Sequence, residues 1–417
     1  MAVAVLAVTS AAAQVVLDDP IKIADAEKLL DTFKGDPLRC EVAPIQPRFN
    51  FSLRLQTGYV CHVPLNQPRI TGHKWVVLTR VTPQHGSQHP VYLSEVVQFP
   101  SSPNTIVEAV GGASWLLGEG RYSVKWLMYD DTGYACRKEW QIAARLSSGE
   151  RKVEPLMAPN TVAGIFWHGA VPAKGANPVA LSRLTVLVDA APMMQRRTTL
   201  SGSDKRLLLD ALSALVEELP ARSVRLVVFH LAQQKEILRR EGFTVEAIPD
   251  VTRALNMLQP SLVDYRVLQN PGGALDLVER LANLESRAKE PSDAVIFLGP
   301  ETHYKNKIPL GALDQPRGAA PRFFYLQCAQ PPHGPSAVPT TQDPMLPGVE
   351  VRDGPPLLPE VLTSRAPSGN RPAGIDNRPD SIEDAVAQLK GRTMIVRSPE
   401  GFAKAVAEVK RLMGIAK

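Results

Sequence analysis

The sequence lacks long apolar runs, has few cysteines and carries only a small excess of charge of one sign. No internal stretch approaches the roughly 20 apolar residues needed to span a bilayer, so we expect no membrane span. Four cysteines without a C-x-x-C pair argue against a zinc or thioredoxin-type site. The net charge is +5 and no basic run is interleaved with aromatic residues, which argues against a nucleic-acid partner.

Catalytic signatures are missing as well. The chain contains no G-x-S-x-G, H-E-x-x-H, Walker A or Rossmann fingerprint. We therefore expect no cofactor and can name no reaction from a motif. The composition is typical of a globular protein, since 44% of the 417 residues are hydrophobic. A chain of this length corresponds to two or three domains.

The amino terminus has features of an export signal. Residues 1–13 are almost wholly small and apolar, and Ala11 and Ala13 form an A-x-A pattern. This pattern predicts a signal peptide over residues 1–13 and a secreted or periplasmic protein. The signal is atypical because no Lys or Arg precedes the apolar run. An N-terminal helix that only resembles a signal, or a start codon assigned too far downstream, remains the alternative.

Three of the four cysteines lie in the first third of the chain, at Cys40, Cys61 and Cys136. A disulfide between two of these three residues fits an exported protein. Sequence alone does not choose the pair. Buried, reduced cysteines are the alternative interpretation.

The N-terminal third is predicted to be rich in strands. Residues 14–37 hold a short amphipathic stretch, which predicts a helical lead-in. Over residues 38–146 the apolar residues recur with period two, as at every second position of residues 49–55, which predicts half-buried strands. Several short strands with turn residues between them predict an antiparallel β-sandwich of immunoglobulin-like type. Residues 147–180 have no sustained period and are interpreted as a connector.

A different pattern covers residues 181–417. Continuous apolar runs at 184–188, 224–229, 294–298 and 323–326 alternate with amphipathic helical stretches. Strands without polar alternation, separated by helices, predict a parallel sheet covered on both faces. This part is therefore predicted to be an α/β doubly wound, Rossmann-like domain.

A proline-rich stretch interrupts this α/β pattern. Residues 329–379 contain 12 of the 37 prolines and show little apolar periodicity, which predicts a long flexible insertion. Helical and strand patterns resume afterwards. Asp380 and Ser398 each stand at the start of an amphipathic stretch, as helix-capping residues do.

The order of these elements resembles a von Willebrand factor A-type domain. The resemblance rests on an apolar strand ending at Asp189, a helix start at Gly272-Gly273, a strand ending at Gly299 and a closing helix after Ser398. It covers about residues 181–328 and 380–415. With the predicted sandwich in front, the chain resembles the VWFA-related proteins that some soil bacteria export in many copies.

That family binds a divalent cation through Asp-x-Ser-x-Ser, a Thr in a later loop and a second Asp. Carried over to this chain, the resemblance places Asp189 at the first Asp, but Ala191 and Met193 at the two Ser positions. Gly273 is near the Thr position, and Gly299 stands at the second Asp. One ligand in five cannot hold Mg²⁺, which prefers six oxygens. We therefore expect no metal and a degenerate metal-ion-dependent adhesion site.

These observations favour a non-enzymatic, adhesion-type protein that binds an unknown protein partner. The partner would bind through the loops at the carboxyl edge of the A-like sheet. The candidate binding residues on these loops are Asp189, Gly273, Gly299 and Glu301. A periplasmic enzyme at the same edge, with Asp189, His230 or His303 in acid–base roles, is the alternative. Two of these three side chains within hydrogen-bond reach in a concave pocket would favour the enzyme. A structural envelope protein is a third possibility.

Overall fold

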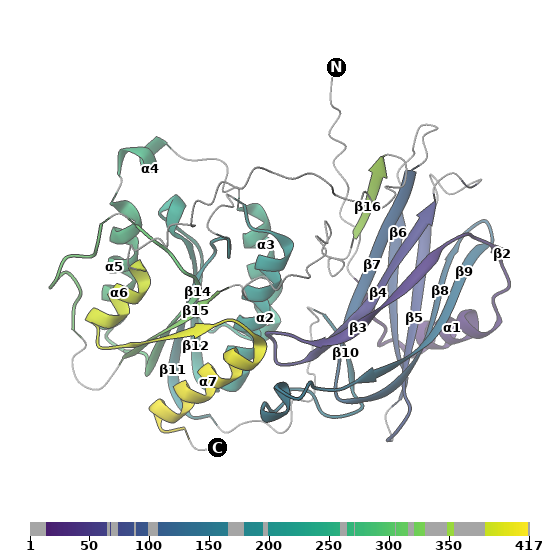
Figure 1. Cartoon of the computed structure of the whole chain (residues 1–417), viewed down its shortest axis with the longest axis horizontal. Coiled ribbons are helices and arrows are strands. Elements are labelled where there is room, and N and C mark those ends of the chain that lie inside the picture. Colours follow the sequence, from purple (N-terminus) through teal and green to yellow (C-terminus); the bar gives the residue numbers. More distant parts are fainter. Residues whose placement is uncertain are drawn as a thin grey trace, which may run out of the picture.

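The computed structural model of the chain describes residues 14–64, 67, 74–86, 89–98, 107–165, 179–194, 199–258, 265–270, 272–304, 306–315, 321–329, 348–353 and 380–415. Within these residues the chain is a mixed α/β protein with three β-sheets, here called A, B and C (Figure 1). The predicted signal peptide at residues 1–13 lies outside the described residues. Among the helices that the structure describes, none is long and apolar enough to cross a membrane.

Sheets A and B face each other in the N-terminal part. Sheet A has the strand order β1 (Val15–Val16), β6 (Val91–Gln98), β5 (Lys74–Pro83), β8 (Gly120–Asp130), β9 (Tyr134–Ala144) and β2 (Asp36–Pro37). Sheet B has the order β10 (Val162–Gly164), β7 (Val107–Leu117), β4 (Leu55–Pro64) and β3 (Glu41–Phe49). The strand pairs are antiparallel except β2 with β9. Tyr59 of β4 contacts Trp126 of β8 across the two sheets, with ring centroids 5.4 Å apart.

The helical lead-in packs against the outer face of sheet A. Helix α1 (Pro20–Thr32) begins after Asp19, whose side chain accepts a hydrogen bond from the backbone N–H of Ile21 at 2.9 Å. Its buried residues Ala26 and Leu30 share an apolar cluster with Leu78, Tyr92, Leu127 and Ala135. The lead-in therefore covers sheet A instead of standing apart from it.

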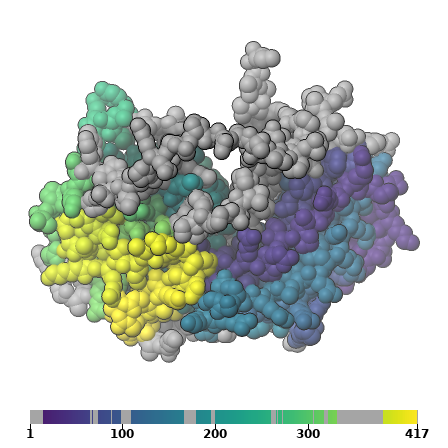
Figure 2. Space-filling view, in the orientation of Figure 1, coloured from purple at the N-terminus to yellow at the C-terminus, as the bar shows by residue number. Residues whose placement is uncertain are grey.

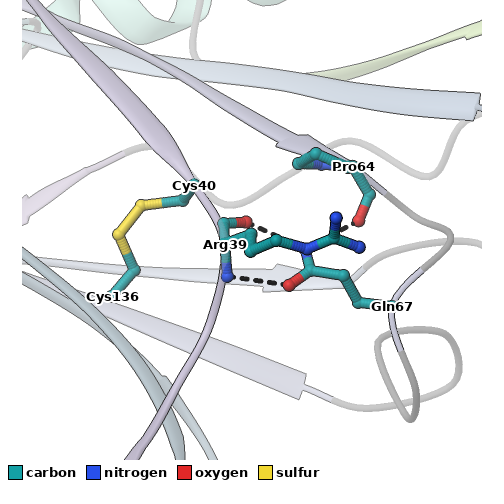
Figure 3. Close-up of a disulfide and its surroundings, with 5 residues drawn as sticks. All are labelled: Arg39, Cys40, Pro64, Gln67 and Cys136. Atoms are coloured by element: carbon teal, nitrogen blue, oxygen red, sulfur yellow. Dashed lines mark hydrogen bonds between the residues drawn. A yellow bond between two sulfur atoms is a disulfide. The ribbon is translucent and has the colours of Figure 1, made fainter.

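A disulfide joins the two sheets. Cys40, which precedes β3, is bonded to Cys136 of β9, with 6.3 Å between their Cα atoms (Figure 3). Gln67 is hydrogen-bonded to the residue before Cys40. Its side chain accepts a hydrogen bond from the Arg39 N–H at 2.7 Å and donates one to the Arg39 carbonyl at 2.8 Å. Cys61 and Cys328 are buried and take no part in a disulfide.

Sheet C and its helices form the C-terminal part. Its strand order is β13 (Lys235–Arg240), β12 (Ala221–His230), β11 (Leu181–Asp189), β14 (Ala294–Pro300), β15 (Arg322–Cys328) and β17 (Arg392–Val396). Neighbouring strands are parallel except the edge strand β13, which is antiparallel to β12. The sheet is thus mixed, not purely parallel.

Helices cover both faces of sheet C (Figure 1). One face packs on α2 (Gly202–Glu218), α3 (Ile248–Met257) and α7 (Pro399–Met413). The other packs on α5 (Gly273–Ser286) and α6 (Ser381–Gln388). Short helix α4 (Tyr265–Gln269) projects from the top of this part. Turns of 3-10 helix occur at η1 (Glu150–Lys152), η2 (Leu231–Gln233) and η3 (Val245–Ala247).

Both predicted caps are confirmed. The Asp380 side chain accepts hydrogen bonds from two backbone N–H groups at the start of α6. Ser398 accepts from the Gly401 N–H at 3.1 Å, with Pro399 in the first turn of α7.

The predicted strand over residues 49–55 is wrong. β3 ends at Phe49, β4 begins at Leu55, and the residues between them form a turn in which Leu53 has a φ of 55°. The alternating apolar side chains are buried because this turn packs on the C-terminal part, where the rings of Phe51 and Phe402 lie 6.1 Å apart. Figure 2 shows the N-terminal strands (purple) in contact with the C-terminal segment (yellow) at this place. The apolar residues at alternating positions therefore reflect contacts of the turn with the C-terminal part and do not indicate a strand here.

Polar groups reinforce this contact between the two parts. Arg54 donates to Glu217 of α2 at 2.6 Å, and the Arg54 side chain is only 6% exposed. Asn50 donates to Asp210 of α2 at 3.1 Å. Apolar side chains from both parts belong to one continuous cluster. The β3–β4 turn is therefore the element that couples the N-terminal and C-terminal parts.

Two segments expected to be irregular contribute strands to sheet B. The predicted connector 147–180 contains β10, which pairs with β7. The predicted flexible insertion 329–379 contains β16 (Gly348–Asp353), which is antiparallel to residues 107–112 of β7. The predicted insertion thus includes a strand, which forms because backbone groups along the edge of β7 are available for pairing. Residues 330–347 and 354–379 lie outside the described residues.

Candidate functional site

Asp189 is a fully buried acid at the carboxyl edge of sheet C. It is the last residue of β11 and is 0% exposed. Neither carboxyl oxygen has a hydrogen-bond partner of normal geometry among the described residues. Burial raises the pKa of Asp189 to about 8; the Leu231 N–H partly opposes this rise, and the nearby charge of Asp380 adds to it. The carboxyl group is therefore mostly protonated and neutral at pH 7.

Gly299 lies directly beside Asp189 on the neighbouring strand β14. A Cβ atom built at Gly299 would lie 2.8 Å from the Cβ atom of Asp189 and 3.2 Å from its carbonyl oxygen. Such contacts are too short for any side chain, so glycine is required here by close packing. The structure thus brings these two predicted residues together, but leaves no space for a second carboxylate at position 299.

Asp380 is a second buried carboxylate at this edge, and it is 3% exposed. Its Oδ1 accepts from the backbone N–H groups of Ile382 and Glu383 at 2.8 and 2.9 Å. Its Oδ2 accepts from the Thr302 N–H at 2.9 Å, the Gln327 side-chain amide at 2.9 Å and the Tyr325 hydroxyl at 3.2 Å. Asp380 therefore ties α6 to β15 and to the segment after β14. Sequence reasoning found only its helix cap, since the other donors are distant in the chain.

Two phenols lie near these acids, the half-buried Tyr304 and the buried Tyr325. The single proton of the Tyr325 hydroxyl is shared between the Pro300 carbonyl, at 2.6 Å, and Asp380 Oδ2, at 3.2 Å. Burial raises the pKa of both Tyr304 and Tyr325, and the Asp189 charge adds to each shift. Both phenols therefore stay neutral in the physiological range.

Further buried polar atoms at this edge have no hydrogen-bond partner among the described residues. Among the described residues, buried atoms without a hydrogen-bond partner include Thr302 Oγ1, His303 Nδ1 and Ser381 Oγ. Buried polar groups are normally hydrogen-bonded to protein or ordered water. These atoms, together with the Asp189 carboxyl, leave unused hydrogen-bonding capacity beside the Asp380 network.

The other predicted residues form no side-chain hydrogen bond with Asp189. Glu301 is exposed, with its Oε1 3.1 Å from His303 Nε2. Gly273 begins α5 and carries no side-chain oxygen; a Cβ atom there would lie 2.1 Å from Oε1 at the end of the Gln234 side chain. His230 ends β12, and its Nδ1 accepts from the Gln233 N–H at 3.1 Å. Burial and the nearby Lys235 lower the pKa of His230 to about 4, which keeps this ring neutral.

The geometry does not assemble an acid–base pair from the candidate catalytic residues. No hydrogen bond or ion pair joins any two of Asp189, His230 and His303, all of which the structure describes. The clustering that would favour an enzyme at this edge is therefore not observed for these three residues.

The same residues do not fit the cation site that the family resemblance implies. Asp189 is one neutral acid, Gly273 offers no side-chain oxygen, and a side chain at position 299 would clash with Asp189. The oxygens of Asp380 already accept five hydrogen bonds. Within the described ranges, no group of three His, Cys, Asp or Glu residues is arranged to hold a metal ion.

An exposed apolar surface lies beyond this edge. Met257 at the end of α3 is 75% exposed, and Tyr265 and Leu268 of α4 are 69% and 68% exposed. We call Tyr265 and Leu268, which lie three residues apart on the short helix α4, the α4 patch. α4 projects from the top of the C-terminal part, close to the start of α5, and forms the raised teal knob at the upper left of Figure 2.

Comparisons with known proteins gave no family. No protein-family model and no curated protein matches the chain. A solved aerotolerance-related membrane protein from Bacteroides fragilis NCTC 9343 is 15% identical with a TM-score of 0.26, covering 54% of this chain and 96% of that chain. The structural genomics target SoR45 is 17% identical with a TM-score of 0.16, covering 26% of this chain and 92% of its own. β-Glucuronidase 2 of Bacteroides uniformis is 8% identical with a TM-score of 0.18, covering 63% of this chain and 34% of its own. Likenesses at these scores carry no argument about fold or activity.

Proposed function

We propose that the chain is an exported, non-enzymatic interaction protein that binds a protein partner at the carboxyl edge of sheet C without a metal ion. In this proposal an immunoglobulin-like sandwich precedes a von Willebrand A-type domain whose cation site is degenerate. The α4 patch carries the proposal. Large apolar side chains that are two-thirds exposed and close in sequence are typical of protein–protein contact surfaces.

Two further observations support it. The buried, neutral Asp189 and the glycine beside it argue against cation-dependent adhesion at this edge. The disulfide between Cys40 and Cys136 supports export, because such bonds persist in oxidising compartments.

The test compares capture of envelope proteins from the native host by three immobilised forms of the full chain, in buffer with EDTA. The forms are wild type, Tyr265→Ser/Leu268→Ser, and the control Val15→Ser/Ile21→Ser, whose residues are 59% and 73% exposed on β1 and α1 of the N-terminal part. A partner recovered by wild type and control, but at least about tenfold less by the patch variant, is the expected result; tenfold corresponds to about 1.4 kcal/mol. Equal recovery by the patch variant, or recovery only with Mg²⁺, contradicts the proposal.

A further inference from the structure

A cavity lies between sheets A and B, at the end of the sandwich where β6 faces β7. Its empty space is about 340 Å³ including the opening to solvent, and the enclosed part has room for about one water molecule. Its walls are mostly apolar. The lining residues that the argument uses are Tyr59, Glu95, Val97, Gly111, Gly112 and Trp126.

Glu95 is an acid inside this apolar cavity. It stands on β6 between the inward-facing residues Leu93 and Val97 and is 4% exposed. Burial alone raises the pKa of Glu95 to about 7, and no hydrogen bond or positive charge from the described residues offsets that effect. A buried carboxyl group without a hydrogen bond or positive charge beside it is costly to ionise. A positively charged ligand bound next to Glu95 would lower that cost.

The surroundings of Glu95 suit a small cation. Gly111 and Gly112 of β7 line the cavity and add no side chain that would fill it. The aromatic rings of Tyr59 and Trp126 form part of the wall, and aromatic faces attract ammonium groups. An ammonium group is about the size of a water molecule and so matches the enclosed space. The apolar remainder of the wall suits a short hydrocarbon chain rather than a second polar group.

We propose that this cavity is a binding site for a small primary amine, whose ammonium group pairs with the Glu95 carboxylate and whose short apolar chain lies toward the opening. The site is independent of the carboxyl edge of sheet C. The other titratable groups in its lining are Tyr59 and Cys61, both on β4. Burial raises the pKa of Tyr59 well above its usual value, which leaves Glu95 as the group that changes charge near neutral pH.

Isothermal titration calorimetry on the full chain tests the proposal with n-propylamine, using 1-propanol as the neutral analogue. We expect the amine to bind and the alcohol to bind at least about tenfold more weakly, a difference of about 1.4 kcal/mol. Amine affinity should increase from pH 5.5 to 7.5, because Glu95 ionises while the amine stays charged. At pH 6.5 the heat should differ between buffers of different ionisation enthalpy, since binding releases the Glu95 proton.

The deciding variant is Glu95→Gln, which keeps the size of the side chain and removes its charge. Glu139→Gln on the outer surface of β9, where the side chain is 70% exposed, is the matched control. Loss of amine binding in Glu95→Gln alone is the expected result. Equal binding in both variants, equal binding of the alcohol, affinity that does not rise with pH in wild type, or no amine binding would overturn the proposal.

Discussion

The side chain of Asp189 occupies the space that a side chain on Gly299 would need, because a Cβ atom at position 299 would lie 2.8 Å from the Cβ atom of Asp189. This relationship explains why position 299 has no room for a carboxylate side chain. We expect Gly299→Asp to lower the free energy of unfolding by about 1–3 kcal/mol, the usual cost of overpacking a core, without creating cation binding.

Urea unfolding measures this loss, with Gly401→Ala as the control. Gly401 lies in the first turn of α7, and a Cβ atom there meets nothing closer than 3.4 Å, so the change should be neutral or stabilising by up to about 1 kcal/mol. A Gly299→Asp variant as stable as wild type would show that the packing against Asp189 is looser than described.

The protonation of Asp189 makes stability depend on pH. Its pKa is about 8 in the folded chain against 3.8 for an ordinary carboxyl group, so the folded state holds a proton that the unfolded state has lost between these values. The stabilising contribution is therefore fully present below about pH 4 and is lost as the pH rises through 8, at no more than about 1.4 kcal/mol per pH unit.

Asp189→Asn should flatten this part of the curve of unfolding free energy against pH. Asp25→Asn, on the exposed side of α1, should leave the curve unchanged. If wild type and Asp189→Asn lose stability in parallel from pH 5 to 8, Asp189 is ionised in the folded protein and the assignment is incorrect.

The ion pair between Arg54 and Glu217 couples the two parts of the chain. Arg54→Met leaves Glu217 partly buried without its cation, and we expect the free energy of unfolding to fall by about 2–3 kcal/mol. Calorimetry should also separate the single unfolding transition into two. Arg253→Met removes an exposed pair with Asp250 and should cost less than about 1 kcal/mol. Equal effects of the two variants would contradict the coupling role of the β3–β4 turn.

The disulfide between Cys40 and Cys136 closes a loop with a sequence separation of 96 residues. Replacing both cysteines with Ser should lower the free energy of unfolding by about 2–4 kcal/mol. Alkylation of the denatured, unreduced chain should label two thiols, Cys61 and Cys328. Four labelled thiols in protein from an oxidising compartment would contradict the bond.

Local patterns predicted much of sheet C. Its apolar strands lack polar alternation because helices bury both faces, and the helix starts at Asp380 and Ser398 carry their own capping side chains. Such signals are contained within a few residues, so they are readable in the sequence.

The errors arose where distant contacts decide the structure. Phe51 is half-buried and packs against Phe402 of α7, about 350 residues away in the chain and beyond any local pattern. Asp380 was recognised as a cap, but its donors Thr302, Tyr325 and Gln327 come together only when β14, β15 and α6 pack. Gly299 likewise appeared as a missing ligand, and only the distance to Asp189 shows why it is glycine.

We propose that the carboxyl edge of sheet C binds its partner without a metal ion. Thermal unfolding of the full chain in EDTA, and then in excess Mg²⁺ or Mn²⁺, tests most directly whether this edge binds a cation. A cation at 100 times its dissociation constant would add about 2.7 kcal/mol, which raises the unfolding temperature by roughly 5–10 °C. We predict no shift with either ion, and no difference between wild type and Asp189→Ala in the response. A rise of that size in wild type that Asp189→Ala abolishes would contradict the account and establish cation-dependent binding at this edge.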